Sequence, residues 1–325
     1  MSKTKSEVKY LSDYSSKDQK WDFHKSVSEK VEYFYSTSKN HKRLGERMDD
    51  CAELLRYIFN DNSDTGETEL KLRDAKFCRV RLCPVCQWRR SMSWRARLFQ
   101  RLPSLLSENP NLRFIFLTLT VQNCEIKDLS NTLKSMNDAF ARFRKLDKFK
   151  VVKGFIRATE VTKSENGKAH PHFHCILAVG KYYFRAKSYL KTEDWAEMWQ
   201  KSLRASYLPI VDVRKIRQKG NELESKAIIE TLKYTTKVED LLSDKDWFLE
   251  LTDQLFKKRF IATGGVLKDM LKEEVSEKEM ILLSDEDLEL NSEEKKAELK
   301  KSLFFGFEPK TQKYKKVKNP YQDIA

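Results

Sequence analysis

The chain has 325 residues, 40% of them hydrophobic and 34% charged, with nine glycines, which is typical of a helix-rich protein with a hydrophobic core. Its longest apolar run, residues 114–121, is far shorter than the ~20 residues that a membrane-spanning helix needs, so we expect no membrane segment. The formal net charge of +14 fits a nucleic-acid partner, although charge alone does not distinguish this from a merely basic, solvated surface.

The N-terminus carries no apolar signal region behind its charged residues, which predicts a cytoplasmic protein. The six cysteines are then expected to be reduced, so a cluster of them indicates a metal rather than disulfides. We expect four segments: a basic arm over 1–47, a Cys-rich segment over 48–102, a larger domain over 103–272, and a charged helical region with a basic tail over 273–325.

The first two segments contain one unusual stretch. The arm is expected to be loose or helical, and residues 51–57 have helical spacing. After a polar loop over 60–67, residues 77–90 are rich in Cys and Arg and continue into a basic helix through residue 101. Pro103 and Pro110 are interpreted as the boundary between the second and third segments.

The cysteines of this stretch have the spacing of a zinc knuckle. Cys83 and Cys86 are two residues apart around Pro84, and Cys78 precedes them, but three thiolates do not close a tetrahedral site. Cys51 is the first choice for the fourth Zn²⁺ ligand and His41 the second; the alternative is reduced cysteines in a core. The predicted DNA contacts around the knuckle are Arg79, Arg81, Arg89, Arg90 and Trp88. For Trp88, plain helix packing is the alternative to stacking on unpaired bases.

The middle of the chain predicts an α+β domain with a central antiparallel sheet and flanking helices. The expected strands are 112–121, 153–162 and 170–179, the last two joined by a turn at 165–167. The expected helices are 128–146, 195–203 and 225–242.

Residues 170–174 place three imidazoles on one face of a strand, because alternate strand residues face the same side. Such a face can hold a divalent metal, and Mg²⁺ or Mn²⁺ would be suitable by chemistry. The alternative is that the histidines only form the polar face of an edge strand, which Pro171 would mark. The candidate ligands are His172, His174 and His170, with Glu160 on the partner strand. A three-residue loop over 165–167 would put Glu160 opposite His172, whereas a two-residue loop would put Val161 there; we favour the first register.

The predicted helix over 225–242 carries a candidate nucleophile. Glu230, Tyr234 and Lys237 lie four and three residues apart and would share one helical face. A tyrosine nucleophile would form a covalent intermediate. Taken alone, a half-buried tyrosine with a surface Glu–Lys pair explains this pattern better, because the chain has twelve tyrosines.

Together these features resemble the replication initiators of small rolling-circle plasmids of Gram-positive bacteria, within the HUH endonuclease superfamily. Residues 116–120 resemble its structural strand motif, 170–174 its histidine motif, and 230–237 its nucleophile motif. Residues 77–90 resemble the Cys segment of one branch, and similarity extends over about 48–272. The outer arms match no motif.

The resemblance implies a sheet carrying the histidines with the tyrosine helix packed over it. It also implies that Tyr234 attacks a phosphodiester at the plasmid's double-strand origin and keeps the 5′ phosphate, while the 3′ hydroxyl primes synthesis. Glu230 then maps to a carboxylate that directs termination, and His170 to a less constant position. The implied partners are a host helicase and a DNA polymerase; the oligomeric state is left open, a homodimer being one option.

The sequence allows two alternative functions. A conjugative relaxase or a single-strand transposase shares the histidine strand but not the Cys segment. A non-enzymatic, zinc-containing DNA-binding regulator explains the charge and the cysteines, but it gives residues 170–174 and Tyr234 no role.

Overall fold

The computed structural model describes residues 8–61, 66, 68–185, 189–219, 222–233, 236–272 and 293–321. It divides the chain into two compact units, residues 1–87 with 273–325, and residues 88–272. This differs from the four expected segments, because the two outer arms belong to one unit and the change of unit falls inside a helix. Pro103 does not end that helix: Leu98, Leu102 and Leu106 bury a continuous apolar stripe around it, and packing outweighs the local effect of proline.

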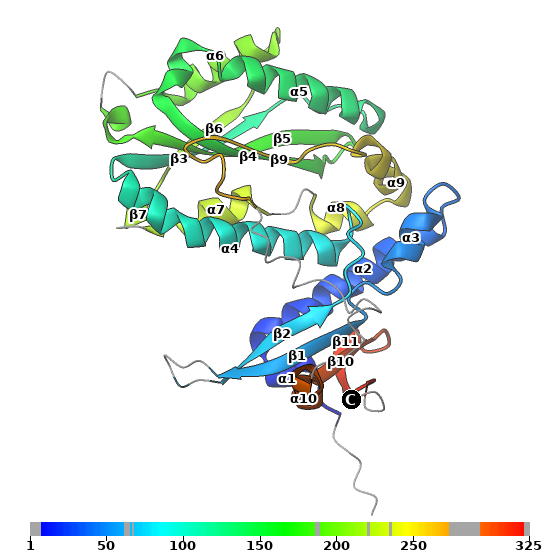
Figure 1. The fold of residues 1–325 in the computed structure, drawn as a ribbon. Coiled ribbons are helices and arrows are strands. Elements are labelled where there is room, and N and C mark those ends of the chain that lie inside the picture. Colours follow the sequence, from blue (N-terminus) through cyan, green and yellow to red (C-terminus); the bar gives the residue numbers. More distant parts are fainter. Residues whose placement is uncertain are drawn as a thin grey trace, which may run out of the picture. The chain divides into compact units, whose positions relative to one another are not determined.

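The first unit contains a four-stranded antiparallel sheet in the order β11-β10-β1-β2 (Figure 1). Its strands are β1 (Leu54–Asp61), β2 (Thr68–Ala75), β10 (Leu303–Glu308) and β11 (Lys313–Val317). The expected helical spacing over 51–57 was therefore wrong. Among the described residues of the C-terminal region, α10 (Glu293–Lys301) is the helical segment, and after it the expected basic tail forms two paired strands.

The N-terminal arm is helical rather than loose. It forms α1 (Leu11–Tyr14), η1 (Ser16–Gln19), α2 (Lys20–Ser36) and α3 (Lys42–Met48). Trp21 of α2 is fully buried, and the Asp22 carboxylate accepts a hydrogen bond from the backbone N–H of Tyr314 in β11 at 2.9 Å. These contacts explain why a polar segment is ordered: Trp21 packs edge-on against Tyr314 of the sheet.

The second unit is built on a five-stranded antiparallel sheet, which confirms the predicted α+β fold. The strand order is β6-β3-β5-β4-β9. The strands are β3 (Leu112–Thr120), β4 (Val152–Lys163), β5 (Ala169–Gly180), β6 (Val211–Ile216) and β9 (Ile261–Gly265), with a short hairpin of β7 (Gln218–Lys219) and β8 (Glu222–Leu223) beside them.

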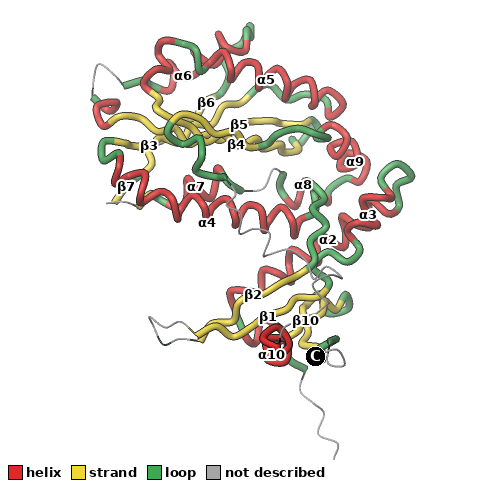
Figure 2. The backbone as a smooth tube through the Cα atoms, viewed as in Figure 1, coloured by secondary structure: helices red, strands yellow, loops and turns green. Residues whose placement is uncertain are grey.

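Helices cover both faces of this sheet, as the red and yellow layers of Figure 2 show. On one face lie α5 (Leu129–Phe143) and α6 (Thr192–Leu203), and on the other α4 (Pro84–Glu108) and α7 (Ser225–Thr231) (Figure 1). The remaining elements are η2 (Ile126–Asp128), η3 (Asp147–Val151), η4 (Lys181–Phe184), α8 (Val238–Leu242) and α9 (Lys245–Gln254). No helix among the described residues is long and apolar enough to cross a membrane.

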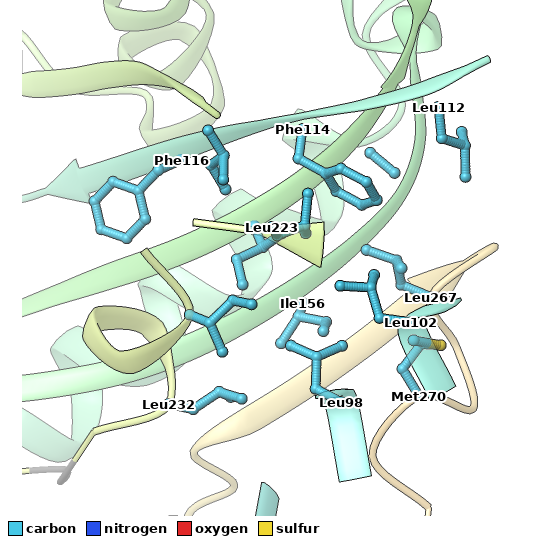
Figure 3. Close-up of a cluster of buried hydrophobic side chains, with 14 of the residues drawn as sticks. Leu98, Leu102, Leu112, Phe114, Phe116, Ile156, Leu223, Leu232, Leu267 and Met270 are labelled. Carbon is cyan, nitrogen blue, oxygen red and sulfur yellow. The ribbon is translucent and has the colours of Figure 1, made fainter. Parts of the chain in front are cut away.

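Each face of the sheet has its own core. Under α4 and α7, Leu98 and Leu232 pack with Phe114, Phe116 and other strand side chains (Figure 3). Under α5 and α6, aromatic rings fill the space, including Phe140, Phe143, Phe173, Trp195 and Trp199. Because β5 alternates, Phe173 belongs to the α5–α6 face and His172 and His174 to the α4–α7 face. The histidines thus continue the row of Ile176 and Ala178, beyond the end of the apolar core.

The expected helix over 225–242 is interrupted. Helix α7 ends at Thr231, and Lys237 is the extended N-cap residue of α8. Glu230 and Lys237 therefore do not share one helical face, and Tyr234 lies outside the described residues. A buried Leu232 under α4 and the amphipathic pattern on both sides made the two short helices look like one.

Candidate active site

The β4–β5 hairpin sets the register on which the candidate metal ligands depend. Ser164 N–H donates to the Lys168 carbonyl at 2.9 Å, which encloses the three residues 165–167, and Gly167 supplies the positive φ of 79° that the turn needs. Glu160 is consequently paired with His172, as predicted for the three-residue loop.

Three side chains of this hairpin converge on one point. Glu160 Oε2 lies 3.0 Å from His172 Nε2 and 2.8 Å from His174 Nε2. All three residues are buried, and their potential ligand atoms lie within 4.8 Å of one another. Two imidazoles and a carboxylate form a donor set suited to a divalent cation with open coordination positions.

The neighbouring strand and backbone hold both imidazoles. His172 Nδ1 lies 3.2 Å from the His170 carbonyl oxygen, and His174 Nδ1 lies 3.2 Å from Thr118 Oγ1 on β3. The carbonyl can only accept, so Nδ1 of His172 donates to it, and Nε2 would present its lone pair to a bound metal. The Phe116 ring stacks on His174 at 5.4 Å between centroids.

The charges around Glu160 favour its ionised form. Burial raises the pKa of its carboxyl group, but hydrogen bonds from His172 and His174 and the charge of Lys233 outweigh burial, and the net pKa is lowered. For His174, burial lowers the pKa more than its contact with Glu160 raises it. A carboxylate beside neutral imidazoles is the protonation state in which all three can ligate a metal.

Lys233 and Glu230 complete the wall of the site. Lys233 Nζ lies 3.0 Å from Glu160 Oε2 and 2.6 Å from Glu230 Oε1, and Glu230 Oε1 lies 3.7 Å from His174 Nε2. Burial lowers the pKa of Lys233, but its two carboxylate partners raise it by more than burial lowers it. The ammonium therefore stays charged. The sequence interpretation gave Lys233 no active role, although its spacing of three from Glu230 was a usable signal.

Other predicted residues lie elsewhere. His170 Nδ1 is hydrogen-bonded to Asn123 Oδ1 at 2.6 Å, and His170 is not one of the three converging residues. Lys237 is exposed at the start of α8. Tyr234 lies outside the described residues; Lys233, which precedes it in the sequence, contacts Glu160.

The first unit brings four cysteines together. The sulfur atoms of Cys51, Cys78, Cys83 and Cys86 lie within 4.8 Å of one another, with Sγ–Sγ distances of 3.6–3.7 Å for three pairs. Cys51 is therefore the fourth member, as first predicted. His41, the second choice, is hydrogen-bonded to Ser38 instead.

Hydrogen bonds to sulfur favour a thiolate in this cluster. Burial raises the pKa of Cys83, but bonds from the other three thiols and from Ser28 lower it well below its usual value. Backbone N–H groups of Cys78 and Val80 also point at cluster sulfurs, at 3.4 Å each. Four sulfurs in this arrangement suit a closed tetrahedral metal site.

The predicted DNA-contacting residues differ in exposure. Arg79 is exposed in a left-handed turn, whereas Arg81, Arg89 and Arg90 are partly buried. Trp88 is buried, with 6% of its surface exposed, so the alternative of helix packing describes it better than stacking on bases.

The family profile and the relatives found by comparison agree with one another. The sequence profile of a family described as "Replication protein" matches residues 69–315. A "Protein rep" of Streptococcus pneumoniae is 34% identical over 284 residues, which cover 85% of this chain and 87% of the relative. A "Protein rep" of a Bacillus species is 36% identical over 262 residues, covering 72% of this chain and 81% of the relative. No solved structure matches.

Proposed function

Because the chain belongs to the family of replication proteins, we propose that it initiates rolling-circle replication of a plasmid by nicking one DNA strand at the double-strand origin and later rejoining it. The family match confirms the resemblance to plasmid replication initiators. The proposed nicking chemistry is supported chiefly by the convergence of Glu160, His172 and His174 on one point of the sheet.

These three residues fit a divalent cation, because their donors are two imidazole nitrogens and a carboxylate held by the β4–β5 hairpin. When bound there, Mg²⁺ or Mn²⁺ would supply Lewis-acid polarisation of a phosphoryl oxygen. Around it, the Lys233 ammonium would offset the phosphate charge, and Thr118 would keep the His174 ring in position.

The proposed nucleophile is Tyr234. Its phenolic oxygen would form a bond to phosphorus while the bond from phosphorus to the 3′ oxygen breaks; the phenol loses its proton and the departing 3′ oxygen gains one. The 5′ phosphate stays on the protein, and the phosphotyrosyl bond conserves the energy needed for rejoining. The 3′ hydroxyl becomes the primer, on which a host polymerase, with a helicase ahead of it, would act.

The direct test is to incubate the protein with a single-stranded oligonucleotide spanning the origin nick and separate the products under denaturing conditions. We expect a covalent protein–DNA adduct that forms with Mg²⁺ or Mn²⁺ and not in chelator. Failure to form an adduct on any part of the origin would overturn the proposed activity and favour a regulator that only binds DNA.

Zinc at the four cysteines should be structural. Replacing Cys83 with serine removes one thiolate, and because metal binding and folding are coupled we expect about one zinc per chain to be lost and the melting temperature to fall by about 10 °C or more. Elemental analysis and thermal melting measure both effects.

Cys124→Ser is the matched control, because Cys124 lies outside the cluster. It should retain zinc. If Cys83→Ser also retains a full complement of zinc, or if the wild-type protein contains none, the structural-zinc proposal is wrong.

Glu230 should act in termination. Its carboxylate lies 3.7 Å from His174 Nε2, within reach of a water at the same phosphate, where a general base contributes about 10²- to 10⁴-fold. Glu230→Gln should leave initial nicking within about threefold of wild type but produce replication products longer than one plasmid unit.

Gel analysis of replication products in cells measures this effect, with Glu239→Gln, an exposed change on α8, as the control. The competing account is that Glu230 only pairs with Lys233, an interaction worth under ~1 kcal/mol at a half-exposed site. Unit-length product from Glu230→Gln would favour that account.

A further inference from the structure

A small pocket opens beside the converging histidines, on the same face of the sheet. Its volume is about 190 Å³, and it lies between the end of β6, the β8–α7 connection and the first turns of α7. Its lining is Phe116, Arg214, Lys215, Ile216, Glu224, Lys226, Ala227 and Glu230. This volume is below the roughly 300–1,000 Å³ of sites for drug-sized ligands, so the pocket suits a single ring system.

Two of the lining residues belong to the candidate active site as well. Glu230 approaches His174 Nε2 at 3.7 Å, and Phe116 stacks on the His174 ring. The pocket is therefore continuous with the place where the scissile phosphate is proposed to lie.

The chemistry of the lining matches an unpaired nucleobase. Arg214 lies over the Phe116 ring at 5.0 Å and its side chain is 59% exposed, so a planar guanidinium rests on an apolar floor. Bases stack on guanidinium planes and aromatic rings. Lys226 adds positive charge for a flanking phosphate, and the carboxylate of Glu224 can accept from an exocyclic amino group.

We infer that this pocket binds the base of one nucleotide adjacent to the scissile phosphate, unstacked from its neighbours. The inference rests on the proposed nicking function and deepens it, because it assigns a residue set to the recognition of the single-stranded origin. Holding that base would fix the register of the strand, so that one phosphodiester, and not the next, faces the histidines.

The test uses the full-length protein and a single-stranded oligonucleotide carrying the mapped nick. A series of substrates replaces each base within three positions of the nick, one at a time, by an abasic site that keeps the backbone. We expect the rate of adduct formation to fall about tenfold or more at one flanking position, and by less than about threefold at the others.

Ala227→Leu links this position to the pocket, because the larger side chain occupies part of the space where the base would sit. The variant should nick the intact substrate as slowly as wild type nicks the sensitive abasic one, and should lose its own sensitivity to that abasic site. Arg214→Gln is a second variant, which changes the exposed surface of the pocket. It should also nick more slowly and lose sensitivity to the abasic site, but to a smaller extent than Ala227→Leu. Melting curves establish that both variants fold.

The outcomes separate the two proposals. If wild type forms no adduct with the intact oligonucleotide, the nicking function fails and the pocket assignment fails with it. If wild type forms the adduct but every flanking abasic substrate reacts equally well, or if folded Ala227→Leu and Arg214→Gln both keep the full abasic sensitivity of wild type, the nicking function stands and the pocket assignment is overturned.

Discussion

Replacing His172 and His174 together with alanine should reduce nicking by about 10²- to 10³-fold. A bound metal supplies several kcal/mol of charge stabilisation in phosphoryl transfer, and each ~1.4 kcal/mol changes the rate tenfold. The two substitutions remove two of the three donors that converge at Glu160. Adduct formation with the origin oligonucleotide, titrated with Mg²⁺ and Mn²⁺, measures the effect.

Origin binding is the accompanying readout, because the histidines lie at one point of the sheet and contribute no formal charge when neutral. It should persist in the double variant. His170→Asn is the matched control, because His170 is hydrogen-bonded to Asn123 and is not one of the three converging residues. Full nicking by the double variant in the presence of chelator would contradict a metal-dependent mechanism. Loss of nicking in His170→Asn alone would make that residue a ligand after all.

The histidine site was predictable because its information is local. Period-two alternation places His172 and His174 on one face, and the length of one turn decides whether Glu160 or Val161 meets them. The Cys cluster was predictable for a different reason. Three cysteines close together in a reduced protein indicate a metal site that needs a fourth ligand, and Cys51 was the nearest further thiol in the preceding sequence.

The first unit could not be predicted in the same way. Strand β1 pairs with β10 across about 250 residues of sequence, for example Leu55 with Phe305, and no local pattern encodes such a pairing. The segment over 51–57 was taken for a helix because a short apolar run fits both periods. Burial of Leu55 and Tyr57 on one face, against Phe305, selects the strand.

The end of α7 shows a third limit. Helical periodicity continued past Thr231, but a break there allows Lys233 to reach both Glu160 and Glu230. Intrinsic propensity is worth at most about 0.7 kcal/mol per ordinary residue, so tertiary contacts such as those of Lys233 with two carboxylates can override it. Residues that serve a site are therefore the places where local patterns mislead most.

Tyr234→Phe should have the largest effect of any single substitution. The change removes one oxygen atom and leaves the ring, so only the proposed nucleophile is lost. We expect the covalent adduct to disappear and nicking to fall by on the order of 10³-fold or more, as for other nucleophile replacements. Binding of the origin oligonucleotide, measured in parallel, should stay within about twofold of wild type, since a hydroxyl group adds little to a polyanion contact.

The chain has twelve tyrosines, so the assignment needs a control and a direct map. Tyr182→Phe, at an exposed site on η4, should nick normally. Digestion of the wild-type adduct should yield one modified peptide containing residues 230–237. The two failures have different meanings. An adduct that survives Tyr234→Phe moves the nucleophile to another residue while the metal site remains. An adduct lost in Tyr234→Phe together with origin binding indicates that the ring holds DNA, and that the chemistry must be sought elsewhere.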